Sequence, residues 1–308
     1  MPGNRIKINS LVGCLILSGL YFACTGAPPV SAADVTLEDD SLRVVFDSRS
    51  GALTQLENKR THWVMERRPE LGVSFRLFAP LPERRWNPVL GTNQVATEVK
   101  KISDHEIHLQ WKNLDSENGG VLPMALSAAV TLTNGVLTFN ATLENNSALT
   151  VESIDYPYFG DLNAPKRATP LTVRVMTNNA PGKFKSDEIY PHFANEKGYW
   201  GVFWPLKTRE VQASRFCLIT AANEGLLIGI TDPSAPYRMQ YTFEQHPGLI
   251  SSINNLVPAE DEIAGTPVHL EFRICHFIFA APHTTTNLAP ILLRSYQGDW
   301  HSGIGLDK

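Results

Sequence analysis

One stretch of the chain combines aromatic rings, an imidazole and carboxylates, namely DEIYPHFANEKGYWGVFW at residues 187–204. Sugars present C–H faces that stack on aromatic rings, and their hydroxyl groups bond to carboxylates and imidazoles. A loop of this composition at the rim of a domain would suit a glycan. The alternative is that GYWGVFW (198–204) is a core strand and that only residues 190–197 form a loop. The candidate carbohydrate-binding residues of this stretch are Asp187, Glu188, Tyr190, His192, Tyr199 and Trp200.

A second candidate stretch, DYPYF at residues 155–159, places Tyr156 and Tyr158 on either side of Pro157. The proline ring fixes its own φ and restricts the residue before it. The backbone is therefore held, and both tyrosine rings are candidates to face a saccharide. The alternative is a strand end that packs against the core, in which case both tyrosines are structural.

No catalytic set can be assigned from the sequence. A sugar epimerase needs a general base and a general acid that converge on the ring, and a glycoside hydrolase needs two carboxylates roughly 5–10 Å apart. Carboxylates are available, but their spacing does not show convergence, and each alone is typical of a solvated surface. The acidic residues considered are Asp187, Glu188, Glu196 and Asp232.

The histidines give no better signal for catalysis. His105 and His108 lie three apart in a strand-like run, which puts them on opposite faces. His62, His269 and His276 also lie in strand-like runs and are interpreted as solvent-facing or satisfied residues. The catalytic residues therefore stay unassigned.

Several classes of function are disfavoured by what the sequence lacks. It has no GxSxG, HExxH, phosphate-loop or dinucleotide motif and no CxxC spacing. The acidic runs LEDDS (37–41) and PAEDE (258–262) lack the alternating oxygen ligands of a calcium loop. We expect no cofactor and no metal. A net charge of −4 without a basic stripe also argues against a nucleic-acid partner.

The elements that would position these residues are strands. Apolar and polar residues alternate with a period of two in SLRVVFDS (41–48), HEIHLQW (105–111), GVLTFNATLEN (135–145) and VHLEFRICHFIFA (268–280). Turn signals such as DSRSG and NLDSENGG separate the runs. This pattern predicts an all-β fold, a large antiparallel β-sandwich. Helical spacing is found mainly in TTTNLAPILLRSYQ (284–297), which predicts a short C-terminal helix.

Four stretches resemble galactose-mutarotase-like β-supersandwich domains, and the resemblance covers most of residues 34–308. They are LRVVFDSRSGALTQLENKRT (42–61), IDYPYFGDL (154–162), GLLIGITDPSAPYRMQYTFE (225–244) and GDWHSGIGLDK (298–308). The last resembles the junction in secreted glycoside hydrolases, where such a sandwich precedes a TIM-barrel catalytic domain related to α-galactosidases. All four are signatures of a fold and none is catalytic. The resemblance therefore implies a supersandwich with a carbohydrate-associated role.

The N-terminus has the pattern of a secretory signal peptide. Arg5 and Lys7 precede an apolar run at 11–24 that is shorter than the ~20 residues of a membrane-spanning helix. The small residues VSA, which end at Ala32, form a cleavage site. We expect cleavage near Ala32 and hence a secreted or periplasmic protein without a membrane span. A lipoprotein anchored through Cys24 is the less favoured alternative.

The expected domain organisation is a signal peptide, a β-supersandwich and a linker, at residues 1–32, 33–283 and 284–308. The linker is expected to be helical and to lead into a catalytic barrel domain that the sequence does not include. Two cysteines remain after cleavage, Cys217 and Cys275, both in strand-like runs. They would pair if those strands are neighbours in an oxidising compartment, but two buried thiols are the preferred interpretation.

Three functions remain open. The preferred one is a non-catalytic N-terminal sandwich of a secreted glycoside hydrolase, which supports the barrel and has a poly- or oligosaccharide as partner. It predicts an exposed apolar patch around Leu292, Tyr296 and Trp300. The second is a stand-alone carbohydrate-binding protein of the cell surface, which predicts glycan binding by the isolated chain. The third is a self-sufficient epimerase-like or lyase-like sandwich enzyme, which predicts a site where a carboxylate and an imidazole converge.

Overall fold

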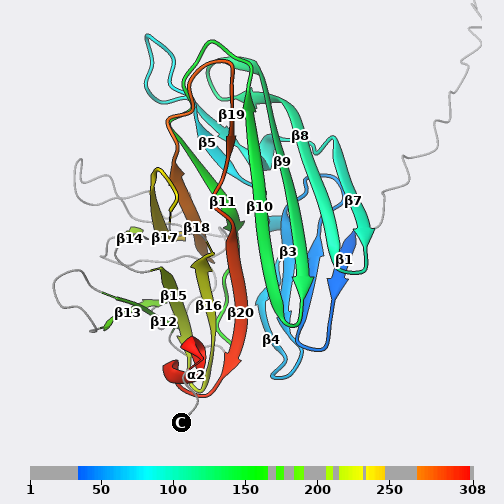
Figure 1. Ribbon diagram of the computed structural model, residues 1–308, viewed down its shortest axis with the longest axis vertical. Helices are drawn as coiled ribbons and strands as arrows, with labels where there is room; N and C mark the ends of the chain where they lie inside the picture. The colour runs from blue at the N-terminus through cyan, green and yellow to red at the C-terminus, as the bar shows by residue number, and fades with distance from the viewer. Residues whose placement is uncertain are drawn as a thin grey trace, which may run out of the picture. The chain divides into compact units, whose positions relative to one another are not determined.

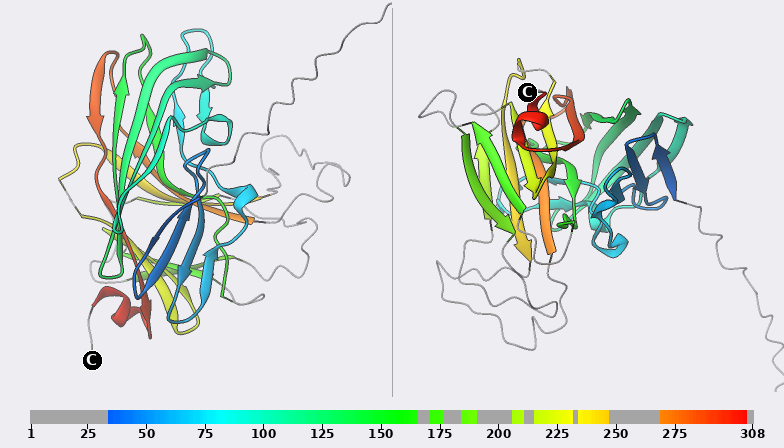
Figure 2. Two further views of the ribbon diagram at one scale, coloured as in Figure 1. Left: turned by 90° about the vertical axis from the view of Figure 1, so that its right-hand side faces the viewer. Right: turned by 90° about the horizontal axis from the view of Figure 1, so that it is seen from below.

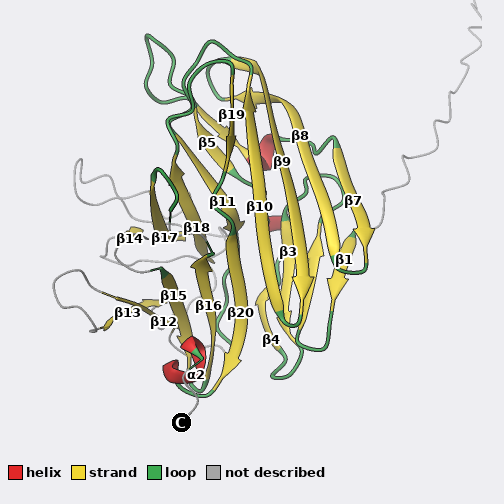
Figure 3. Ribbon diagram, viewed as in Figure 1, coloured by secondary structure: helices red, strands yellow, loops and turns green. Residues whose placement is uncertain are grey.

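The computed structural model describes residues 34–165, 171–176, 184–190, 206–210, 215–231, 234–246 and 269–305. Within these residues, antiparallel strands form three sheets, and the only α-helix is short and lies near the C-terminus (Figures 1 and 3). The predicted fold, an all-β sandwich with a short C-terminal helix, is confirmed.

The first sheet has four strands in chain order, β1 (Val35–Glu38), β2 (Leu42–Phe46), β3 (Leu53–Asn58) and β4 (Trp63–Glu66). The turn between β2 and β3 is the predicted DSRSG, in which Gly51 has a positive φ of 67°. A side chain at this glycine would also meet the indole of Trp111, because an added Cβ would lie 2.6 Å from it. The turn therefore needs glycine both for its backbone and for the close approach of the ring.

The second sheet has ten strands, and their spatial order departs from the chain order. That order is β13 (Phe184–Tyr190), β12 (Leu171–Met176), β15 (Phe216–Ala221), β16 (Glu224–Ile230), β20 (Ile291–Gln297), β10 (Val136–Asn145), β9 (Gly120–Thr133), β8 (Glu106–Ser116) and β7 (Glu98–Ser103), with β19 (Thr284–Asn287) paired to β10. The strands β8, β9, β10 and β20 run side by side in Figure 1.

The third sheet has six strands and positions the site described below. Its order is β14 (Leu206–Glu210), β17 (Arg238–His246), β18 (His269–Phe277), β11 (Ser153–Phe159), β5 (Arg76–Phe78) and β6 (Pro88–Leu90). Two 3₁₀ turns, η1 (Pro69–Leu71) and η2 (Gly91–Asn93), lie beside β5 and β6 in the chain, and the helix is α2 (Trp300–Ile304).

One apolar core takes side chains from all three sheets, as the period-two pattern predicts. In β2 the residues Leu42, Val44 and Phe46 are buried, and in β8 the alternating residues Ile107 and Leu109 are buried. The core therefore lies on the faces that the alternation indicated.

The helix predicted at 284–297 is wrong, because this segment forms β19 and β20. The strand β20 lies inside the ten-stranded sheet, between β10 and β16. Ile291 and Leu293 join the main core on one face, and Leu292 and Tyr296 join the apolar cluster at α2 on the other. A strand covered on both faces is apolar at consecutive positions, so its sequence also fits a helical period. Pro290, which precedes β20 and lacks an N–H donor, separates it from β19.

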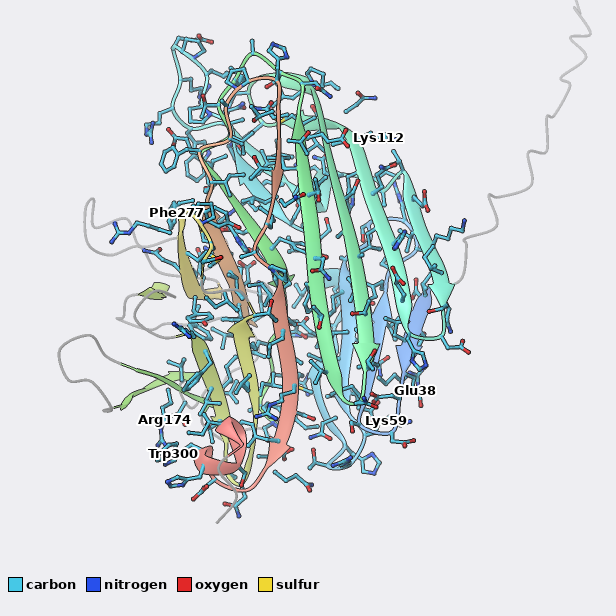
Figure 4. All side chains as sticks on the ribbon, in the orientation of Figure 1. Glu38, Lys59, Lys112, Arg174, Phe277 and Trp300 are labelled. Carbon is cyan, nitrogen blue, oxygen red and sulfur yellow. The ribbon has the colours of Figure 1, made fainter. Side chains whose placement is uncertain are left out.

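The helix lies instead at 300–304 and packs back on the ten-stranded sheet (Figure 2). The carboxylate of Asp299 accepts a hydrogen bond from the His301 N–H, and Gly305 ends the helix at φ 78°. Figure 4 shows Arg174 beside Trp300, with its guanidinium 5.3 Å from the indole. The apolar cluster under the helix contains Phe216, Leu218, Leu227, Leu292, Tyr296, Trp300 and Ile304.

This packing contradicts the exposed apolar patch expected around Leu292, Tyr296 and Trp300. The Tyr296 side chain is 7% exposed, and Leu292 and Trp300 are half-buried in the same cluster. Trp300 therefore finds its apolar partners within the sandwich.

The two cysteines lie in different sheets, Cys217 on β15 and Cys275 on β18, and they do not form a disulfide. The condition for a disulfide, that their strands are neighbours, is not met. The preferred interpretation of two buried thiols is confirmed for Cys217, whereas Cys275 is half-buried. No helix among the described residues is long and apolar enough to cross a membrane.

Gly160 offers a test of how tightly β11 is held against the segment that leads into β5. A Cβ added at Gly160 would lie 1.9 Å from the carbonyl oxygen of Leu71. Because backbone cannot yield as a flexible side chain does, Gly160→Ala should lower the free energy of unfolding by about 3 kcal/mol. Denaturant titration measures the change. The control is Gly120→Asn, at a position with φ 64° and no atom within 4 Å, which should be close to neutral. Equal stability of the two variants would contradict the prediction.

Candidate functional site

One face of the six-stranded sheet carries ionisable side chains. On β18 the residues Leu270, Phe272 and Ile274 are buried in the apolar core, so Glu271 and Arg273 point to the opposite face. The same alternation on β17 places Glu244, which is opposite Glu271, on this face. We call this side of the sheet the polar face, and its ionisable residues with described side chains are Arg76, Asp155, Tyr158, Arg238, Glu244, His269, Glu271, Arg273 and Cys275.

A β-bulge on β11 brings two side chains to the polar face. Asp155 is opposite Cys275 and Tyr158 is opposite Arg273, so three steps along β11 match two steps along β18. In a regular strand, residues 155 and 158 would face opposite sides, and the extra residue corrects this. Asp155 and Tyr158 both contact Arg273 as a result, whereas Tyr156 points into the core.

Arg273 is the centre of the polar face, with a side chain only 4% exposed. Its Nη2 lies 2.5 Å from Glu244 Oε2, its Nη1 lies 3.2 Å from Glu271 Oε2, and its Nε lies 3.1 Å from Asp155 Oδ2. Burial alone would lower the pKa of Arg273, but the neighbouring Tyr158, Asp155 and Glu244 outweigh burial and raise the pKa above its usual value. The guanidinium is therefore a fixed positive charge.

The carboxylate of Glu271 accepts hydrogen bonds from neighbouring donors. Its Oε2 accepts a hydrogen bond from the Tyr158 hydroxyl as well as from Arg273. Its Oε1 lies 3.7 Å from the Nε2 of His269. Burial, and then the charge of Glu271, raise the pKa of Tyr158 well above its usual value, so the phenol keeps its proton. A carboxylate, a phenol and an imidazole thus converge within one site.

The two glutamates face each other across the strand pair, because Glu244 and Glu271 are directly opposite in the β17–β18 register. Like charges in that position repel, and Arg273 offsets the repulsion by contacting both. At the other side, Arg76 Nε donates to Asp155 Oδ2 at 2.8 Å. The side chains of Arg76 and Glu244 are 23% and 25% exposed, so they form the accessible border of the cluster.

A second buried cluster holds the segment that follows β11. Arg68 binds the Asp161 carboxylate through Nε and Nη2, and the Asp161 N–H donates to both carboxylate oxygens of Glu66. Burial, and then the nearby Asp161 and Glu271, raise the pKa of Glu66 well above its usual value. This cluster ties β4 to the end of β11 and supports the position of Tyr158.

Aromatic rings gather at one end of the polar face. We call Phe78, Trp86, Phe277 and Phe279 the aromatic end. Trp86 meets Phe78 edge to face, with ring centroids 5.1 Å apart. Figure 4 shows Phe277 near the loop that follows β18, far from Trp300 at the opposite end. A pocket of about 510 Å³ opens here, lined by Pro236, Tyr237, Arg238, Met239, Gln240, Phe277, Ile278 and Phe279.

A larger groove of about 670 Å³ lies on the ten-stranded sheet. Its polar side chains largely bond to one another, because Gln110 Nε2 donates to Ser127 Oγ at 3.1 Å and Thr142 Oγ1 donates to Asn287 Oδ1 at 2.9 Å. The groove is also lined by Glu98, His108 and Tyr237, and the Tyr237 hydroxyl accepts a hydrogen bond from the Ala289 N–H. The described residues include no group of His, Cys, Asp and Glu placed to hold a metal ion.

The fold has counterparts among known structures, although no family model matches the chain and no curated protein matches it in sequence. A galactose mutarotase related enzyme from Lactobacillus acidophilus superposes with a TM-score of 0.52 at 12% identity, over 86% of this chain and 98% of that one. A candidate aldose 1-epimerase from Escherichia coli K12 gives 0.50 at 16% identity, over 86% and 99%. The chain has a galactose-mutarotase-like β-sandwich fold.

The galactose-mutarotase-like fold also occurs within a larger enzyme. The α-galactosidase from Lactobacillus brevis superposes with a TM-score of 0.50 at 7% identity, over 87% of this chain. This chain spans 40% of the length of that α-galactosidase. At these identities the likeness concerns the fold alone.

The predicted site residues are distributed as follows. Asp187, Glu188 and Tyr190 lie on β13, an edge strand of the ten-stranded sheet, and the placement of their side chains is outside the described part of the chain. The other residues predicted in that stretch, His192, Tyr199 and Trp200, lie outside the described residues altogether. Their role in carbohydrate binding stays a prediction.

The two tyrosines of the second candidate stretch are both 5% exposed but differ in surroundings. Tyr156 belongs to the core and lies edge-on to Phe139, with ring centroids 6.0 Å apart. Tyr158 belongs to the polar face and binds Glu271. The strand-end interpretation therefore describes Tyr156, and Tyr158 joins a cluster that the sequence did not indicate.

Sequence reasoning missed Glu271, Arg273, Glu244 and Arg76. The signal was present, because EFRICHF alternates charged and apolar residues more strongly than an ordinary solvated strand. What the sequence did not show is that the bulge on β11 and the register with β17 bring charges from separate strands together.

His276 points from β18 into the core and provides a pH-dependent test. Its Nε2–H donates to the Tyr156 carbonyl at 2.8 Å, and burial lowers its pKa from 6.5 to about 4. The unfolded chain therefore binds an extra proton between these values, and stability falls as pH decreases from 6.5 to about 4, by about 3 kcal/mol from this residue.

His276→Gln keeps a donor for the Tyr156 carbonyl and removes the titration. We expect the variant to be less stable than the wild type at pH 7 and its deficit to shrink by about 3 kcal/mol at pH 4. Urea unfolding at several pH values measures this. Parallel stability curves for the two proteins would show that His276 does not titrate as expected.

Proposed function

We propose that this sandwich binds a saccharide on the polar face of the six-stranded sheet. The observation that carries the proposal is the convergence of Tyr158, Arg273 and His269 on Glu271, with a second glutamate opposite. Sugar hydroxyls both donate and accept, so they match a surface on which carboxylates and fixed donors alternate. The partly exposed Arg76 and Glu244 give a ligand its first polar contacts.

We infer for the whole protein a place among secreted glycoside hydrolases, with this sandwich ahead of a catalytic barrel domain that it supports. The patch predicted as the docking surface, around Leu292, Tyr296 and Trp300, is packed in the apolar cluster at α2, so this arrangement requires the barrel to dock elsewhere on the sandwich. The similarity to the α-galactosidase, of which the chain matches 40%, supports this arrangement. The pattern of residues 1–32, typical of a signal peptide, supports secretion or a periplasmic location. In this arrangement the sandwich contributes saccharide binding and the barrel the hydrolysis.

An epimerase-like activity is the second candidate, and one observation favours it. The third open function predicted a carboxylate and an imidazole that converge, and Glu271 lies 3.7 Å from His269 and accepts a hydrogen bond from Tyr158. Glu271 would accept the proton of the C1 hydroxyl while protonated His269 donates a proton to the ring oxygen, which opens the ring. Closure on the other face of the carbonyl gives the second anomer. The two epimerase-type structures, which the chain matches almost end to end, support this candidate.

Glu271→Gln should weaken saccharide binding by about 10–100-fold, because it replaces a charge-assisted hydrogen-bond acceptor by a neutral amide. Isothermal titration calorimetry with galactose, glucose, mannose and xylose measures the change. The matched control is Glu98→Gln, on β7 of the ten-stranded sheet, which should bind as the wild type does.

Tyr158→Phe tests the same site with less risk to folding, since it keeps the ring and removes only the hydroxyl. It should also weaken binding. Anomer exchange measured by NMR on the wild type separates the two candidates, because exchange above the buffer rate that Glu271→Gln removes identifies an epimerase. Binding without exchange identifies a binding domain. If no saccharide binds, or if both variants bind normally, the proposed site is wrong.

A further inference from the structure

A continuous series of contacts joins the aromatic end to Glu271. The Trp86 ring contacts the Phe78 ring, and the Arg76 guanidinium lies 5.4 Å from the centre of the same Phe78 ring. Arg76 binds Asp155, which lies 3.1 Å from Arg273, and Arg273 reaches Glu271. The exposed rings and the buried carboxylate therefore belong to one surface.

The backbone brings the second pair of rings to the same end. The Glu152 N–H donates to the Phe78 carbonyl at 2.9 Å, and the Phe279 N–H donates to the Glu152 carbonyl at 3.2 Å. Phe78 and Phe279 thus lie on either side of Glu152 at the ends of adjacent strands. In Figure 1 the loop between β5 and β6 and the loop between β18 and β19 lie at the same end of the sheet.

Two of the four rings of the aromatic end, Trp86 and Phe279, are unusually open to solvent. Trp86 is 57% exposed and Phe279 is 62% exposed, whereas most other large apolar side chains of the described residues are buried. Exposed aromatic groups that border a pocket mark binding sites more often than isolated surface residues do. The Trp86 ring packs against Phe78. The preceding residue, Arg85, donates to the Glu152 carboxylate, from Nη1 to Oε1 at 2.9 Å and from Nη2 to Oε2 at 2.7 Å. The ring is therefore presented by an ordered support.

The distance along β18 from Glu271 to the aromatic end is too long for one sugar ring to span. Glu271 and Phe277 are six residues apart on β18, which corresponds to about 20 Å at the rise of a β-strand. Between them the polar face offers Arg273 and Cys275, and β17 adds Gln240 and Thr242, with Arg238 opposite Phe277. Polar groups line this path, with the Tyr158 ring near one end and the aromatic end at the other, which matches the hydroxyls and C–H faces of a chain of sugar units.

We propose that the ligand of this site is an oligosaccharide that lies along β18, with one unit at Glu271 and Tyr158 and further units on the aromatic end. The inference rests on the proposed saccharide binding and adds that chain length determines affinity. It commits to a glycan because the rings are interspersed with guanidinium and amide groups, whereas a protein partner would favour a continuous apolar surface.

The test compares each monosaccharide with its tetrasaccharide, in galactose, glucose, mannose and xylose series, by titration calorimetry on the whole chain. We expect the tetrasaccharide of the preferred series to bind at least about tenfold more tightly than the monosaccharide. Trp86→Ala and Phe279→Ala should each weaken tetrasaccharide binding about three- to tenfold, the worth of one aromatic contact, and leave monosaccharide binding unchanged.

Val121→Ala is the control, since Val121 on β9 is 65% exposed and is distant in the sheet order. It should change neither affinity. If the monosaccharide binds through Glu271 and the tetrasaccharide binds no better, the inference is overturned and the proposed function stands. If the aromatic variants weaken both ligands equally, the inference is overturned as well. If no saccharide of any length binds, both the proposed function and the inference fail.

Discussion

The buried guanidinium of Arg273 organises the six-stranded sheet. It joins side chains from β11 and β17 to its own strand and contacts Glu244, Glu271 and Asp155. Removing a partner from a buried ionic network leaves an uncompensated charge, which costs several kcal/mol, so each member constrains the others. The bulge on β11 follows from the same constraint, because without it Tyr158 would point away from the arginine.

This arrangement connects stability with the proposed saccharide binding. The same contacts that neutralise the carboxylates also fix the orientation of Glu271 and Tyr158 before any ligand arrives. A preorganised polar surface loses little conformational entropy on binding. The ring of Tyr158, 5.6 Å from the Arg273 guanidinium, adds a cation–π contact that holds the phenol in place.

The sequence was informative where structure depends on local periodicity. The strands around Leu42, Ile107 and Phe139 were predicted with the correct buried faces, because alternation alone decides which side of a half-buried strand meets the core. The segment at 291–297 was misread as a helix, because a strand covered on both faces loses that alternation. The site was not predicted, because Arg76, Asp155 and Glu271 come from distant parts of the chain and meet only through strand register.

The position of β20 has a consequence for synthesis. Residues 291–294 pair with residues 136–139 of β10, so one edge of β10 waits for a partner that is made much later. A nascent chain that has completed β7 to β10 therefore presents an open strand edge, which favours association with other chains. Because contacts so distant in sequence form slowly, assembly of the large sheet should finish only after translation has passed residue 297.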